Sequence, residues 1–207
     1  MPCHRIFCKY CTATVPYREL LEALLWVSQG TRPDIAYTES QFAKFSCKKN
    51  HVHWFALKKI LCYLKGTIEY GTHYKKPGQR APVLLRDLSL PEAYLSSLSA
   101  KDSVGVTMDA YVDADYANSL DNCRSVTGYV NFIAEDPVTW QSKTQTSVAL
   151  STIEAEYMAL AADTQEALWQ KMVLQELEVE VSGPVAIRED NNACQMVAYH
   201  AGNFSCT

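Results

Sequence analysis

Three short acidic segments hold residue types that could carry out metal-assisted chemistry. They occupy 111–117, 151–160 and 187–192, with the sequences YVDADYA, STIEAEYMAL and IREDNN. Each segment sets a carboxylate among apolar neighbours, where an isolated charge is costly. Carboxylates drawn together from separate elements predict a shared cation with oxygen ligands, an arrangement that phosphate chemistry uses.

The elements that would position these acids follow from the hydrophobic pattern after residue 106. Alternating apolar residues predict strands, and a capping signature at Ser151 and Glu154 predicts the start of a long helix. The order is β-β-β-α-β-α, so the fourth strand should lie parallel to the first after a right-handed crossover. We therefore predict an α/β fold with a mixed sheet, with strands at 106–112, 128–133, 138–142 and 185–188 and helices at 153–177 and 191–199.

This order of elements would bring three carboxylates to one edge of the sheet. Asp113 follows the first strand, Asp190 follows the fourth, and Glu156 lies in the first turn of the long helix. Ligands of open α/β sheets usually bind at that edge. Any one of these acids could be ordinary, because acids favour first helical turns. All three in this topology predict a site for two Mg²⁺ or Mn²⁺ ions.

The first part of the chain is basic and helical. Residues 1–90 have a charge balance of +8 and residues 91–207 one of −12, which could place a polyanion on the first part and cations in the second, or leave two solvated surfaces. The pattern predicts a helical module over 17–76, with helices near 17–30, 34–45 and 51–65 and a short strand at 67–74.

Two further stretches carry weaker patterns. Residues 1–16 are expected to be poorly ordered, and residues 77–105 are expected to form a linker or insertion.

A zinc hypothesis arises from Cys3, His4, Cys8 and Cys11. No matching second pair of ligands follows, so zinc is not expected. The sequence has no signal pattern or membrane-length apolar run, which favours an intracellular protein, cytoplasmic or nuclear, without membrane association.

Several motifs occur in the order known from one family of mobile elements. In the second half they are YVDADYA, RSVTGYV, WQSKTQ, ALSTIEAEYMAL, EALW and DNNA, and upstream they are YRELLEALLW, GTRPDIAY and LKKILCYLKGT. The second half resembles the ribonuclease H domain of copia-type LTR retrotransposon Pol polyproteins. The upstream part resembles the segment that joins reverse transcriptase to that domain, so a reverse transcriptase domain is a candidate partner.

The resemblance implies a ribonuclease H-like fold that hydrolyses the RNA strand of an RNA–DNA hybrid, leaving 3′-hydroxyl and 5′-phosphate ends. It implies that Asp113, Glu156 and Asp190 are the acidic metal ligands, the residues that the geometry also selects. Asp115 is an acidic neighbour that could approach the metals, whereas Glu154 is expected to cap the helix.

Nucleic-acid contacts are expected mainly from basic residues. Those of the helical module could follow the phosphates of a hybrid or could form a solvated face. They are Lys44, Lys48, Lys49, Lys58, Lys59 and Lys65. Weaker candidates for contacts with the nucleic-acid strands of the hybrid are Arg124, Ser125 and Gln145.

Two departures from the family pattern leave the activity open. The family continues to a fifth strand and a helix with a fourth acidic ligand, which we do not find before the sequence ends at Thr207. The stretch 77–106 also differs. An alternative to an active ribonuclease is therefore a non-catalytic retroelement remnant that binds nucleic acid or a protein partner, and a zinc-dependent interaction module is a third hypothesis.

Overall fold

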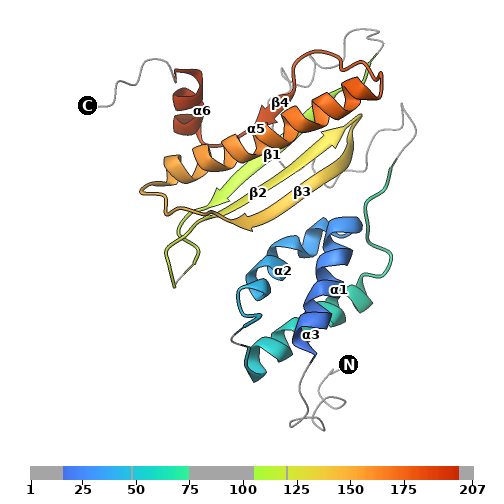
Figure 1. Cartoon of the computed structure of the whole chain (residues 1–207), viewed down its shortest axis with the longest axis vertical. Coiled ribbons are helices and arrows are strands. Elements are labelled where there is room, and N and C mark those ends of the chain that lie inside the picture. The colour runs from blue at the N-terminus through green and yellow to red at the C-terminus, as the bar shows by residue number, and fades with distance from the viewer. Residues whose placement is uncertain (1–15, 48, 75–104, 120, 201–207) are drawn as a thin grey trace. The chain divides into compact units, whose positions relative to one another are not determined.

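The computed structural model of the 207-residue chain describes residues 16–47, 49–74, 105–119 and 121–200 (Figure 1). Contacts divide the chain into two compact units, which separate between Gly71 and Thr72. Nearly all of the predicted N-terminal segment and linker, and all four residues of the zinc hypothesis, lie outside the described residues.

The first unit consists of the predicted helices. They are α1 (Tyr17–Gly30), the short 3₁₀ helix η1 (Pro33–Ile35), α2 (Ala36–Ala43) and α3 (His51–Gly66). Asn50 caps α3, because its side chain accepts a hydrogen bond from the backbone N–H of His53 at 3.0 Å. Apolar residues spaced three and four apart face a shared core, as the pattern predicted: Tyr17, Leu21, Leu24, Ile35, Leu57 and Ile60.

The predicted strand at 67–74 is wrong. The segment forms turns and irregular backbone after α3. The guanidinium of Arg32, only 5 % exposed, donates to the backbone carbonyl of Thr67 at 3.0 Å and to its hydroxyl at 2.7 Å. Arg32 also pairs with Asp34 at 2.7 Å. Tertiary contacts to the end of the helix thus override the local strand propensity.

The second unit is a mixed sheet with two helices. Its elements are β1 (Met108–Asp115), β2 (Val126–Ile133), β3 (Asp136–Thr144), α5 (Thr152–Glu176), β4 (Ala186–Arg188) and α6 (Asn192–Tyr199). The described strands have the order β3-β2-β1-β4; β1, β2 and β3 are antiparallel, and β4 is parallel to β1. The predicted α/β class and order of elements are confirmed, and the arrangement is consistent with a ribonuclease H-like fold.

Small residues let α5 lie close to the sheet. Ala155 and Ala159 are fully buried on α5 and belong to one apolar cluster with Val112 and Ala114 of β1. The helix begins at a capped turn, where the Ser151 hydroxyl accepts a hydrogen bond from the backbone N–H of Glu154 at 3.2 Å. This cap and the alanine contact fix the first turn of α5 beside β1.

None of the helices in the described segments has the length and apolar character needed to cross a membrane.

Candidate metal centre

The centre lies where β4 separates from β1. The two strands pair over only three positions, from Asp109 opposite Ala186 to Tyr111 opposite Arg188. Arg188 holds this short ladder, because its guanidinium pairs with Asp109 at 2.8 Å and lies 5.0 Å from the ring centroid of Tyr111. Beyond these pairs β1 continues to Asp115, paired there with β2. The edge of β1 past Tyr111 is therefore free of β4.

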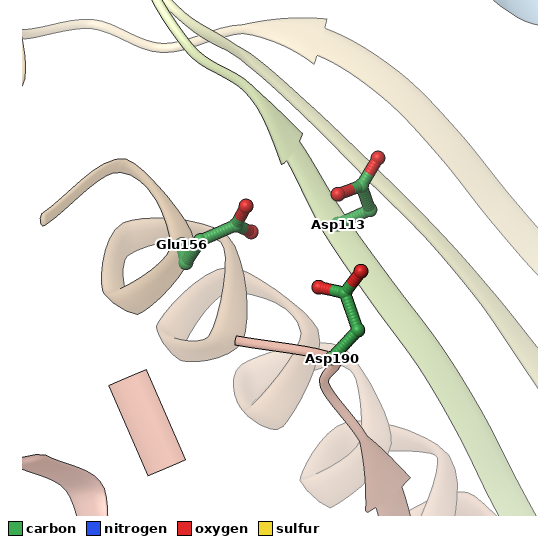
Figure 2. A group of neighbouring side chains, drawn as sticks. All are labelled: Asp113, Glu156 and Asp190. Carbon is green, nitrogen blue, oxygen red and sulfur yellow. The ribbon is translucent and has the colours of Figure 1, made fainter. Parts of the chain in front are cut away.

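Three carboxylates meet at this edge of β1 (Figure 2). Oxygens of Asp113 on β1, Glu156 in α5 and Asp190 after β4 all lie within 4.8 Å of one another. Asp113 and Asp190 are exposed, whereas Glu156 is 8 % exposed. The three residues come from three separate elements, as the sequence predicted, and together they could hold a metal ion.

Asp113 lies within its strand. The sequence predicted a strand that ends at Val112, but β1 extends to Asp115, and Asp113 pairs with Gly128 of β2. The prediction placed the end too early because acidic residues are uncommon in strands. Asp113 thus projects from a paired inner strand, which fixes its backbone.

Glu156 is the buried acid of the three. Burial raises the pKa of its carboxyl to about 7, and the negative charges of Glu189, Asp113 and Asp190 act in the same direction. A hydrogen bond with the backbone of Ala114 opposes this rise in the pKa. Its Oε2 atom has no hydrogen-bond partner among the described residues. Figure 2 shows the Glu156 carboxylate directed toward the two aspartates. A buried, unpartnered carboxylate oxygen that faces two further carboxylates is the environment that a cation would satisfy.

Comparisons with known proteins match most of the chain to Pol polyproteins from transposons. The chain is 33% identical to the retrovirus-related Pol polyprotein from transposon TNT 1-94 of Nicotiana tabacum, over 91% of its length. It is 30% identical, over 84% of its length, to the corresponding polyprotein from transposon RE2 of Arabidopsis thaliana. The chain belongs to the family of retrovirus-related Pol polyproteins from transposons. It spans about a tenth of the length of these two Pol relatives.

A shorter protein also matches most of the chain. The chain is 34% identical to the secreted RxLR effector protein 161 of Plasmopara viticola, over 75% of the chain and 91% of that protein. No family model and no solved structure matches the chain. Membership of the Pol family therefore rests on these sequence relatives.

One acid next to the centre of this Pol-family chain was not predicted from the sequence. Glu189 precedes Asp190 and is 8 % exposed. Burial raises the pKa of its carboxyl, and the charges of Asp190 and Asp113 act in the same direction. Its Oε1 accepts a hydrogen bond from the backbone N–H of Asn191 at 3.0 Å. In the sequence, its position directly after a predicted strand and next to a candidate metal ligand could have indicated that Glu189 lies near the centre.

The other acidic neighbours have different surroundings. Asp115 is exposed, and its carboxylate accepts a hydrogen bond from the side-chain amide of Asn118. It is not part of the three-carboxylate group. Glu154 is exposed, and its carboxylate accepts a hydrogen bond from the backbone N–H of Leu150 at 2.6 Å, which agrees with the predicted capping role.

Two of the residues predicted to contact nucleic acid lie inside the sheet unit. Gln145 is buried, and its amide donates to the Thr127 hydroxyl at 3.1 Å and to the Ala155 carbonyl at 2.9 Å. Ser125 is fully buried, and its hydroxyl accepts from the backbone N–H of Ala117 at 3.0 Å. Both side chains therefore join elements of the fold. Arg124 is half-buried next to Ser125.

The predicted phosphate-binding lysines belong to the helical unit. Lys44, Lys49, Lys59 and Lys65 are exposed, and the ammonium of Lys44 donates to Gln41 at 2.7 Å. Lys58 is half-buried, with its ammonium 4.7 Å from the ring centroid of Phe55 and 5.2 Å from that of Trp54. Lys48 lies outside the described residues. Contact of these lysines with nucleic acid stays a prediction.

Proposed function

We propose that this chain hydrolyses the RNA strand of RNA–DNA hybrids by two-metal catalysis, as a ribonuclease H-like domain. The observation that carries the proposal is the meeting of Asp113, Glu156 and Asp190 at the edge of a mixed sheet. Retroelement ancestry and the motif order support the choice of substrate. The 2′-hydroxyl is the group that distinguishes the RNA strand from DNA.

The residues present fit Mg²⁺ or Mn²⁺. All three donors are carboxylate oxygens, which these hard cations prefer. The buried, unpartnered Oε2 of Glu156 is an acceptor that the described protein groups leave unsatisfied, and a cation would offset the repulsion among the three charges. Sulfur and imidazole ligands, which softer metals favour, do not belong to this group.

The fold places each of the three acids on a defined element. Asp113 is held on an inner strand, Asp190 follows a strand anchored by Arg188, and Glu156 is fixed by the cap and alanine contacts of α5. The exposed carboxylates of Asp113 and Asp190 are open to a phosphodiester from solvent. Divalent ions held by these carboxylates would supply activation of a water molecule and stabilisation of the leaving oxygen.

Cleavage of a labelled hybrid tests this function. The purified chain, with Mg²⁺ or Mn²⁺, should cut the RNA strand of an RNA–DNA hybrid and leave a DNA duplex of the same sequence intact. Asp113→Asn should lower the rate by at least about 100-fold, because it removes the charge of one of the three carboxylates proposed to hold the divalent ions. Asp121→Asn, at an exposed turn position, is the matched control and should keep the parental rate.

The same assay separates the catalytic proposal from non-catalytic binding. Binding of the hybrid without metal-dependent cleavage, or equal cleavage by the parent and Asp113→Asn, would contradict hydrolysis by this centre. A metal-independent complex with the hybrid would instead support the non-catalytic alternative.

A further inference from the structure

Gln145 is hydrogen-bonded to both the sheet and the first turns of α5. Its backbone N–H, directly after the last residue of β3, donates to the carbonyl of Ser125 at 2.9 Å. Its side-chain amide donates to the hydroxyl of Thr127 on β2 at 3.1 Å and to the backbone carbonyl of Ala155 in α5 at 2.9 Å. Gln145 is 6 % exposed, and both acceptors are buried. We call this connection from Thr127 through Gln145 to Ala155 the Gln145 bridge.

Both ends of the bridge lie next to an acid of the metal centre. Ala155 directly precedes Glu156 in α5. Thr127 pairs across the sheet with Ala114, which directly follows Asp113 on β1. The bridge thus joins the backbone beside one candidate ligand to the strand pair that carries another. Functional side chains must be held to within roughly 0.5 Å of their productive positions, and supporting hydrogen bonds provide this precision.

The bridge depends on the two amide hydrogens of a glutamine. A primary amide offers two N–H donors and one carbonyl acceptor. In Gln145 the nitrogen reaches both acceptors, whereas the buried Oε1 has no hydrogen-bond partner among the described residues. An unsatisfied buried acceptor costs free energy, so it is the two donors that account for a glutamine at this position. Methionine, which has a similar size, donates neither bond.

We propose that Gln145 is a positioning residue of the metal centre and that its bridge sets the distance between Glu156 and Asp113. This inference rests on the proposed two-metal function and goes beyond it, because it assigns a residue that holds the ligands without being one. The role also differs from the direct nucleic-acid contact that the sequence predicted for Gln145.

Gln170 offers a matched comparison on the same helix. It is also buried, and its amide nitrogen donates to the hydroxyl of Thr139 on β3 and to the carboxylate of Glu166. Its Oε1 likewise has no hydrogen-bond partner in the described part of the chain. Gln170 therefore also joins α5 to the sheet, but about four helical turns after Glu156. Loss of this contact should loosen the helix without moving the centre.

Titration calorimetry with Mn²⁺ on the full chain tests the proposal without using activity. It compares Gln145→Met with Gln170→Met at a temperature where circular dichroism shows both variants to be folded, because methionine fills a similar volume without donating hydrogen bonds. Both variants should melt below the parent, but only Gln145→Met should bind Mn²⁺ at least about tenfold more weakly. Thr127→Val, which removes one end of the bridge, should also weaken binding, whereas Thr127→Ser keeps the hydroxyl and should keep the parental affinity.

Binding of the RNA–DNA hybrid separates positioning from a direct nucleic-acid contact. In metal-free buffer, fluorescence anisotropy should give Gln145→Met the parental affinity for the hybrid. At saturating Mn²⁺, its kcat should fall while KM for the hybrid stays unchanged. Weaker hybrid binding by Gln145→Met together with parental Mn²⁺ affinity would overturn the positioning role and support the contact.

The outcomes also distinguish this inference from the proposed function. Equal Mn²⁺ affinity in the parent and Gln145→Met, together with weakened binding in Asp113→Asn, would overturn the role of Gln145 alone. Equal weakening in Gln145→Met and Gln170→Met would overturn it too, because the loss would then follow general loosening of α5. A parent chain that binds no Mn²⁺ would overturn both proposals. If Gln145→Met does not fold, Thr127→Val replaces it, and parental Mn²⁺ affinity in that variant would overturn the inference.

Discussion

Asp163 on α5 accepts a hydrogen bond at 2.9 Å from the side-chain amide of Asn131 on β2, and both side chains are buried. The second carboxylate oxygen of Asp163 has no partner in the part of the chain that is described. Burial raises the pKa of Asp163 to about 6, although the hydrogen bond from Asn131 opposes the shift. The contact between helix and sheet thus contains an acid that binds its proton more tightly in the folded protein than in the unfolded chain.

Asp163→Asn should reduce the pH dependence of stability. The folded pKa of about 6 lies above the ordinary value of 3.8, so the folded state binds the proton more tightly and the parent loses stability as pH rises through that window. The variant should melt about 3 °C or more above the parent at pH 8, a shift typical of roughly 1 kcal/mol, and the difference should shrink toward pH 4. Thermal melts of the metal-free protein from pH 4 to 8 measure this, with Asp121→Asn as the exposed control. A constant difference across the range would contradict the assignment.

Affinity for Mn²⁺ should depend on pH through Glu156. Its carboxyl, with a pKa of about 7 in the metal-free protein, must lose its proton before it can bind a cation. Affinity should therefore rise by up to about tenfold per pH unit below pH 7 and level off above it. Calorimetry between pH 5.5 and 8.5 checks this, and buffers of different ionisation enthalpy should reveal the released proton. An affinity that is flat across this range would exclude Glu156 as the titrating ligand.

Enlarging a buried alanine of α5 should weaken metal binding at the centre without changing any of the three carboxylates. Ala159 is fully buried against β1, so Ala159→Val should push the helix outward and lower the stability by about 1–3 kcal/mol. Because Glu156 lies one turn earlier on the same helix, Mn²⁺ affinity should also fall. Ala161→Val, at an exposed position of α5, is the control for the loss of helix propensity. Parental affinity in Ala159→Val would show that the centre tolerates displacement of the helix.

Removing lysines from the helical unit should weaken hybrid binding uniformly across sequences. Lys49 and Lys59 are exposed. Affinity falls as the salt concentration rises, and the steepness of log affinity against log salt should decrease by about 0.7–0.9 for every phosphate that a lysine no longer neutralises. Fluorescence anisotropy at several salt concentrations compares the parent with the double variant Lys49→Ala and Lys59→Ala. Lys143→Ala, an exposed lysine of β3, serves as the control. An unchanged salt slope in the double variant would identify these lysines as a solvated face.

The sequence predicted the parts of the fold that local pattern encodes. Helical and strand periods, the Ser151 cap and the crossover rule were enough to place Asp113, Glu156 and Asp190 on three converging elements. These signals are local or topological, and the structure retains them.

Other features depend on contacts that no local pattern contains. The turn after α3 follows from Arg32, which is distant in sequence and donates to Thr67. Gln145 and Ser125 resemble surface polar residues by type, yet their partners Ala155 and Ala117 lie within the fold. Glu189 was not predicted because its burial depends on tertiary contacts, which no local pattern contains.

The three-residue ladder between β1 and β4 also bears on motion. Few hydrogen bonds and the Arg188–Asp109 pair hold the strand that carries Asp190, whereas Asp113 belongs to a ladder of eight pairs with β2. Segments with so few protecting contacts open locally at low free energy, well before the whole domain unfolds. The amide protons around β4 should exchange with solvent faster than those of β1 and β2. The Asp190 side of the centre would therefore open locally more often than the Asp113 side.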